Sequence, residues 1–128
     1  MFDLYQENIL DHAHAPRHWG LLPEPDLHAA DLNPLCGDEL EITLRVDENS
    51  RVIGIGWDGH GCAISQAAAS MLGEQVMGKT LDEVKALSKE DVFELIGIPL
   101  SMNRVKCALL SLKVVKAAVY GIPHDDEE

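Results

Sequence analysis

The residues with the clearest chemical potential are three cysteines and an aspartate close to the first of them. Cys36 and Asp38 lie two positions apart in the segment 33–38 (NPLCGD). Pro34 favours a turn or the end of a strand here, and Gly37 is able to adopt a positive φ. Such a turn lets the thiol and the carboxylate point at one spot. Because thiolates and carboxylates both bind zinc in proteins, this segment predicts half of a tetrahedral metal site.

The other two cysteines lie in settings that lower the pKa of a thiol. Cys62 immediately precedes a helix expected over residues 63–77, where the helix dipole favours a thiolate. Cys107 lies in the first third of a helix expected over residues 101–120, and Lys106 is its direct neighbour. A nearby cation also favours the thiolate. Both cysteines are therefore candidate metal ligands or nucleophiles.

Two interpretations of the three cysteines remain open. Free cysteines commonly behave as small buried hydrophobic residues, and their wide spacing in this chain carries little information. Alternatively, Cys36, Cys62 and Cys107 together with Asp38 supply four ligands, which suits a zinc site or an iron–sulfur centre. Four anionic ligands would leave excess negative charge, which Lys106 is placed to offset.

Histidines are the remaining candidate ligands. His60 lies in a turn between Gly59 and Gly61, two residues before Cys62, and is a possible substitute ligand. The simpler interpretation of His60 is a solvated turn residue. Gly61, between His60 and Cys62, is expected to support the site, as Gly37 and Lys106 are. Four further histidines are interpreted as polar residues of a helix end and loops, because their spacing does not suit a metal cluster. They are His12, His14, His18 and His28.

Composition and charge restrict the class of protein. The chain has 128 residues, of which 46% are hydrophobic and 25% charged, as expected for one globular domain. We assign this domain to residues 1–124 and expect the acidic tail, residues 125–128, to be disordered. The net charge of −12 argues against nucleic acid and anionic membranes as partners. It is compatible with a basic protein partner.

The location expected from the sequence is the cytoplasm. No apolar run approaches the roughly 20 residues of a membrane span. The first residues lack the basic region and apolar core of a signal peptide. Thiols in the cytoplasm stay reduced, and three cysteines do not suit a closed disulfide framework.

The first half of the chain predicts one helix and a pair of strands. Residues 2–14 form an amphipathic pattern ended by Pro16, and a loop follows over 17–25. Residues 28–33 are a weak strand, whereas 39–46 alternate cleanly between apolar and polar side chains. The helix is expected to bury Phe2, Tyr5, Ile9 and Leu10 on one side.

A second strand over residues 51–58 returns after a turn, which predicts an antiparallel hairpin with one buried face. Ile53, Ile55 and Trp57 are expected on its apolar side. Gly54 and Gly56 occupy the opposite side and indicate that another segment packs closely there.

The second half of the chain is expected to be helical. After the helix 63–77 and Gly78, Thr80 and Glu83 form a capping-box pattern that opens a short helix. Ser88 is expected to start another helix over 89–96, which is ended by Gly97. The last helix, 101–120, is expected to carry an apolar stripe. The stripe consists of Met102, Val105, Leu109 and Leu112, with Leu110, Val114 and Ala117 beside it.

Three segments resemble the cysteine motifs of a known family. Residues 33–38 (NPLCGD), 59–67 (GHGCAISQA) and 104–108 (RVKCA) are similar, in order, to the motifs of the U-type iron–sulfur cluster assembly scaffolds. That family includes IscU, SufU and the N-terminal domain of NifU. The opening segment 4–20 is also similar, so the resemblance covers essentially the whole chain.

The resemblance implies an α+β fold, with a three-stranded antiparallel sheet and an N-terminal helix and C-terminal helices packed on it. It also implies that Cys36, Cys62 and Cys107 meet at one exposed end beside Asp38. Such a site accepts sulfur from a cysteine desulfurase, builds an iron–sulfur cluster and passes it to apo iron–sulfur proteins or carrier proteins. Zinc occupies the same site in many members. We expect Cys36 to be the first sulfur acceptor, because a turn residue is easily reached.

The resemblance is closest to SufU-like members, although the usual SufU insertion between the second and third cysteines is absent. Lys106 stands where IscU-type proteins have a histidine, and 99–103 (PLSMN) replaces their chaperone signal. The leading hypothesis is a scaffold and sulfur acceptor rather than a turnover enzyme. A zinc-dependent sulfurtransferase is the alternative, and a structural zinc module is a third interpretation.

Overall fold

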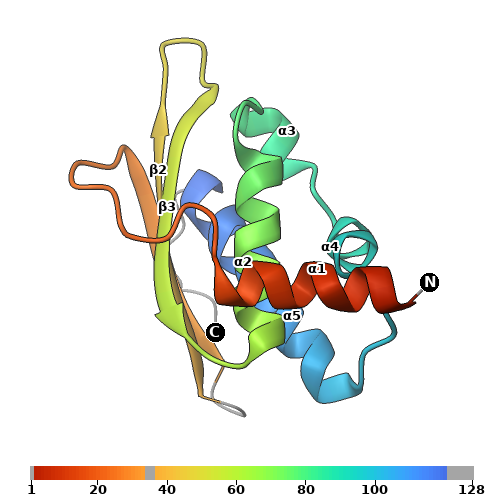
Figure 1. Cartoon of the computed structure of the whole chain (residues 1–128). Helices are drawn as coiled ribbons and strands as arrows, with labels where there is room; N and C mark the ends of the chain where they lie inside the picture. The colour runs from red at the N-terminus through yellow and green to blue at the C-terminus, as the bar shows by residue number, and fades with distance from the viewer. Residues whose placement is uncertain (1, 34–36, 121–128) are drawn as a thin grey trace.

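The computed structural model describes residues 2–33 and 37–120 (Figure 1). It confirms the α+β class. The order of elements is α1 (Phe2–His14), β1 (Leu27–Asn33), β2 (Asp38–Val46), β3 (Val52–His60), α2 (Ala63–Val76), α3 (Leu81–Lys85), α4 (Lys89–Ile96) and α5 (Met102–Tyr120). The acidic tail and Cys36 lie outside the described residues.

The three strands form one antiparallel sheet in the order β1-β2-β3. Helices cover one face of this sheet: α5 packs against β1 and β2, and α2 packs against β3 (Figure 1). The helix α1 lies across α2, whereas α3 and α4 pack against α5. The alternation of apolar residues in β2 explains this arrangement, because it gives the sheet one face to bury.

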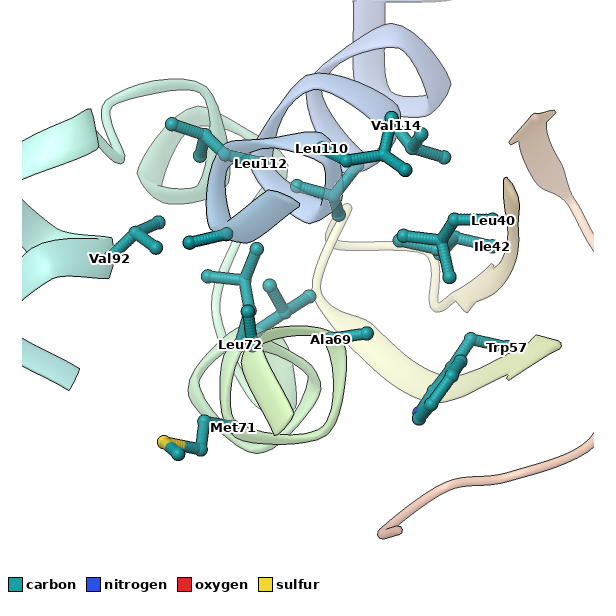
Figure 2. Packing of buried hydrophobic residues seen from close by; sticks show 14 of the residues in the cluster. Leu40, Ile42, Trp57, Ala69, Met71, Leu72, Val92, Leu110, Leu112 and Val114 are labelled. Atoms are coloured by element: carbon teal, nitrogen blue, oxygen red, sulfur yellow. The ribbon is translucent and has the colours of Figure 1, made fainter. Parts of the chain in front are cut away.

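The core lies between the sheet and the helices α2 and α5. Figure 2 shows Leu40, Ile42 and Trp57 of the sheet facing the layer of these helices. Leu44 is fully buried, and Ala67 to Ala69 of α2 are buried as well. Small residues at these positions let α2 approach its neighbours closely, as its sequence suggests.

The capping signals predicted from the sequence are confirmed. The Thr80 hydroxyl accepts a hydrogen bond from the Glu83 backbone, and the Glu83 carboxylate accepts one from the Thr80 backbone. Ser88 and Asp91 form the same reciprocal pair at the start of α4. Gly97 ends α4 with a φ of 75°. These signals lie within four residues of one another, so they do not depend on distant packing.

The outer face of the sheet is partly covered by the loop between α1 and β1. A Cβ at position 56 would collide with the Gly20 carbonyl oxygen. A Cβ at position 54 would lie 3.6 Å from Leu22 Cδ1. The predicted close packing is therefore confirmed at Gly56, whereas a Cβ at Gly54 would make only ordinary van der Waals contacts.

Three residues expected on buried faces are exposed instead. Leu10 is 52% exposed because α1 packs against α2 along a stripe that takes Ile9 but not its neighbour. Ile53 is 52% exposed because the β2–β3 register shifts beside it, between Val52 and Gly54. Met102 is 81% exposed because it begins α5, ahead of the buried part of that helix.

His12 also differs from the interpretation as a polar helix-end residue, because it is only 5% exposed. Its Nδ1 lies 2.6 Å from Ser70 Oγ, which also accepts a 2.8 Å hydrogen bond from the Arg17 backbone N–H. Ser70 therefore has its hydroxyl proton available for Nδ1 of a neutral imidazole. Burial is the main cause that lowers the pKa of His12, and Arg17 adds to it; Glu74 and Asp11 oppose it.

Among residues 2–33 and 37–120, the helices are too short or too polar to cross a membrane.

Candidate metal centre

Three of the predicted metal ligands meet at one place. The ligand atoms of Asp38, Cys62 and Cys107 all lie within 4.8 Å of one another. They come from the start of β2, the residue before α2, and the first third of α5. Among the described residues, this is the one group of three or more His, Cys, Asp or Glu side chains that could hold a metal ion. The fourth predicted ligand, Cys36, lies outside that part.

The antiparallel hairpin explains why Asp38 and Cys62 meet. The cross-strand pair Glu39 and His60 places the start of β2 beside the end of β3. Asp38 therefore lies next to the turn that leads into α2. The helix α5 packs on β1 and β2 and brings Cys107 to the same end of the sheet.

Gly61 permits the contact between these two ligands. The Cys62 backbone N–H donates a 3.3 Å hydrogen bond to Asp38 Oδ1. A Cβ on residue 61 would lie 2.4 Å from the same oxygen, so a side chain here would displace the carboxylate. Gln66 of α2 also donates a 3.2 Å hydrogen bond to the Gly61 carbonyl oxygen and holds the turn.

The donor set fits a thiophilic metal ion. Asp38 is 2% exposed, and its Oδ2 is buried without a hydrogen-bond partner among the described residues. Buried charges are normally paired or bound to a metal, so this oxygen is suited to a cation. Two sulfurs and one carboxylate oxygen match the ligands of zinc and iron–sulfur sites, and one further thiolate would complete a tetrahedron.

The site is less exposed than the family resemblance implies. Cys107 is 3% exposed and Asp38 is similarly buried, while Cys62 is half-buried. Cys62 is the N-cap residue of α2 and makes no side-chain capping hydrogen bond. Reagents therefore reach the described part of the site from the side of Cys62.

The structure also describes three other residues that the sequence singles out near the ligands: Gly37, Lys106 and His60. Gly37 has the expected positive φ, 77°, and its N–H donates a 2.8 Å hydrogen bond to the Asn33 carbonyl oxygen. Lys106 is exposed beside Cys107. The side chain of His60 is 71% exposed and its Nε2 lies 4.0 Å from a Glu39 carboxylate oxygen. His60 does not join the group of three ligands.

Two long-range contacts near the site could not be read from the sequence. One is the hydrogen bond between Asp38 and Cys62, for which the glycine at position 61 was the only local signal. The other is the ion pair of Asp31 with Lys113, 2.8 Å long, which joins the end of β1 to α5. Asp31 and Lys113 are far apart in the chain, so no periodic pattern links them.

Comparisons with known proteins agree with this geometry. The sequence profile of the NifU-like N terminal domain matches residues 4–126. The scaffold protein IscU of Haemophilus influenzae is 30% identical over 118 residues, covering 90% of this chain and 92% of that protein. The crystal structure of a proposed SUF-system iron–sulfur cluster assembly scaffold from Fervidobacterium islandicum has a TM-score of 0.78 and 26% identity. It covers 88% of this chain and 94% of that one.

A second relative is described as a zinc-dependent sulfurtransferase, SufU of Bacillus subtilis. It is 32% identical, and the alignment covers 91% of this chain and 89% of SufU. The alignment spans 134 positions, more than the 128 residues of this chain. That relative therefore holds residues with no counterpart here, in line with the missing insertion. The chain is thus similar to IscU and to SufU to nearly the same degree.

Proposed function

Because the chain belongs to the NifU-like N-terminal domain family, which comprises the IscU and SufU type of iron–sulfur scaffold, we propose that it assembles iron–sulfur clusters. Sulfur would come from a cysteine desulfurase, and the cluster would go to apo iron–sulfur proteins or carriers. The proposed ligands are Cys36, Cys62, Cys107 and Asp38. The observation that supports this most is the meeting of three ligand atoms around a buried, unpartnered carboxylate oxygen.

The proposed sulfur transfer is an exchange between two sulfur atoms. The Cys36 thiolate attacks the outer sulfur of a persulfide on the desulfurase. A new S–S bond forms on Cys36 while the S–S bond of the desulfurase breaks, and the desulfurase leaves as a thiolate. The proton on the outer sulfur moves with it, so no electrons are gained or lost in this step.

The cluster is the cargo of the scaffold, and its assembly needs electrons. Reduction of one transferred sulfur to sulfide takes two electrons, which an external thiol or electron-carrier protein must supply. Ferrous iron then joins sulfide on the ligand set. Asp38 is the proposed labile ligand, because a carboxylate oxygen holds a soft centre less tightly than sulfur does.

A zinc-dependent sulfurtransferase is the second candidate function. The 32% identity to SufU and the presence of Lys106, rather than a histidine, before Cys107 favour it. Bound zinc would keep the cysteine ligands deprotonated at neutral pH. In that case the protein would relay sulfur from the desulfurase without building a cluster.

Anaerobic reconstitution separates the two functions. Metal-free protein is mixed with ferrous iron, cysteine, dithiothreitol and a catalytic amount of desulfurase, and visible absorption and acid-labile sulfide are measured. A scaffold gains both signals, and Cys36→Ser, Cys62→Ser and Cys107→Ser each abolish them. Stimulation of the desulfurase by wild type without any cluster would reject the scaffold in favour of the sulfurtransferase.

Two variants test the carboxylate ligand. Asp38→Asn removes the charge with little change of shape and should weaken zinc binding in a competition titration with a chromophoric chelator. Asp82→Asn, an exposed position of α3, makes the same chemical change away from the site and is the control. If the zinc affinity of Asp38→Asn equals that of the control, Asp38 is not a ligand.

A structural zinc module is the third interpretation, and chelation tests it. If removal of the metal unfolds the domain, as in small zinc modules, the structural role gains support. The proposal also places the protein in a reducing compartment, the cytoplasm, because the exchange requires thiolates.

A further inference from the structure

The outer face of the sheet, opposite α2 and α5, is covered on only one half. The loop between α1 and β1 crosses that half, where the Leu22 N–H donates a 3.0 Å hydrogen bond to Thr43 Oγ1. The Thr43 hydroxyl in turn donates a 2.8 Å hydrogen bond to the Gly56 carbonyl oxygen. The Thr43 hydroxyl therefore links the covering loop to β3.

The other half, which we call the site-side face, has no such cover among the described residues. It consists of Ala30, Leu32, Glu39, Glu41, Asp58 and His60. The cross-strand pairing arranges these residues in two rows, one centred on Glu39 and one on Glu41. The next row contains Asn33 paired with the candidate ligand Asp38. The Asp38 side chain lies on the helix-covered face with Leu40, so a molecule seated on the site-side face would lie at the same end of the sheet as the candidate metal centre, on its opposite face.

The site-side face is hollowed, with a volume of about 530 Å³. Ala30 and Gly59 contribute little side chain to the hollow, whereas Leu32 is 50% exposed beside it. The size falls within the range of binding pockets rather than of surface irregularities. The hollow can accept long side chains whose stems lie on the small residues.

The charges of the hollow are not balanced within the described chain. Glu41 and Asp58 are direct cross-strand partners, an arrangement in which like charges destabilise a sheet. Neither carboxylate has an ion pair with a cation among residues 2–33 and 37–120. The carboxylate of Asp31 belongs to the helix-covered face instead, where it is paired with Lys113 of α5. The pair of Glu41 and Asp58 thus creates a local negative potential that an external cation would relieve.

We infer that the site-side face is a docking surface for a partner protein that presents a basic segment containing arginine. A guanidinium group can bridge two carboxylates with several hydrogen bonds, which suits the spacing of facing strand residues. The arginine stem would pack over Ala30, and an apolar residue of the partner would contact Leu32. A second copy of this chain does not fit, because it carries the same net charge of −12.

This inference rests on the proposed function in one respect only: cluster assembly explains why a partner protein would bind near the candidate metal centre. The surface itself can be tested without cluster chemistry. The probe is a synthetic peptide of alternating arginine and leucine, titrated into the full-length ¹⁵N-labelled protein. Amide shift changes should concentrate on the site-side face. Changes spread over the acidic residues of α3 and α4 would overturn the proposal.

A pair of charge-matched variants sharpens the test. Glu41→Gln/Asp58→Asn should weaken peptide binding at least tenfold, because it removes the unbalanced charge. Glu90→Gln/Glu94→Gln removes the same charge from exposed positions of α4 and should leave binding within twofold. Equal weakening by both double variants would mean a general attraction to an acidic chain and would overturn the docking surface.

Stability and sulfur acceptance distinguish the possible failures. Glu41→Gln/Asp58→Asn should unfold at the same or a higher temperature than wild type, since it relieves a like-charge pair. A lower unfolding temperature together with unchanged peptide binding would assign these residues a purely structural role and reject the surface. If wild type accepts no sulfur from a desulfurase, the proposed function fails, while the peptide titration still decides whether the surface exists.

Discussion

Substitution of Gly61 by alanine tests the geometry of the candidate metal centre without altering a candidate ligand. The backbone φ of Gly61 is not positive, so alanine acts through space rather than through backbone strain. Its Cβ would lie 2.4 Å from Asp38 Oδ1 and 2.7 Å from Asp38 Cγ. Ordinary contacts of a Cβ begin at 3.4 Å, so the carboxylate must retreat by about 1 Å in a close-packed surrounding.

The retreat breaks the hydrogen bond from the Cys62 N–H, which is already 3.3 Å long. Loss of a hydrogen bond to a charged group costs about 1.5–3 kcal/mol, and forced overpacking costs about 1–3 kcal/mol. Because the same movement relieves part of the clash, the two terms overlap. We expect the free energy of unfolding of metal-free Gly61→Ala to fall by about 2–4 kcal/mol.

The assay combines urea unfolding with a zinc titration. Mutation of a residue that holds a metal ligand in position typically lowers the metal affinity by about 10- to 100-fold. Gly54→Ala is the matched control, because its Cβ would meet its nearest neighbours at 3.5 and 3.6 Å and its φ is not positive. We expect this control to stay within about 0.5 kcal/mol of wild type, with unchanged zinc affinity.

The same unfolding free energy and the same zinc affinity for Gly61→Ala and Gly54→Ala would refute a steric conflict between a side chain at position 61 and Asp38. That result would mean that Asp38 has room to move without loss. A loss of stability without a loss of zinc affinity would leave the packing argument intact but remove Asp38 from the ligand set.

Three further predictions concern the fold. Burial lowers the pKa of His12 below 6.5 in the folded protein, so the unfolded chain binds the proton more tightly. The free energy of unfolding therefore falls as the pH drops from 6.5 toward the pKa of His12 in the folded protein. Urea unfolding at about pH 7.5 and about pH 5.5 should show a smaller fall for His12→Gln than for wild type, with the exposed His14→Gln as control. Leu44→Ala, at a fully buried position, should cost about 2–5 kcal/mol, whereas Leu10→Ala, which is 52% exposed, should change stability by less than about 0.5 kcal/mol in the same assay. Thr80→Ala should cost about 1 kcal/mol by removing the cap of α3, and a cost indistinguishable from zero would contradict the capping box.

Local signals in the sequence were sufficient to predict where helices and strands form. The alternation after residue 38 predicts β2, and the Thr80 and Ser88 patterns fix the starts of α3 and α4. The positive φ of Gly37 was also predictable, because glycine adopts a positive φ in a turn without steric cost. Each of these features depends on residues within a few positions, where backbone sterics and hydrogen bonding decide the outcome.

Side-chain burial was less predictable, because it depends on elements that lie far away in the sequence. Met102 has helical spacing with buried residues of α5, yet it is 81% exposed because the helix begins there, beyond its neighbours. His12 looks polar in the sequence, but α1 presses it against Ser70 of α2. A periodic pattern states which residues share a face, not how far the neighbouring element extends over it.

The types of the candidate ligands were set by the sequence alone, and the assignment of Cys36 still depends on it. The meeting of Asp38, Cys62 and Cys107 was decided by tertiary structure, because three elements had to pack before their ligand atoms came within 4.8 Å. Residue types determine which chemistry is available, through charge, polarisability and pKa. Only the long-range packing of the sheet against α2 and α5 determines whether those groups share one ion, because no local interaction spans the sequence between them.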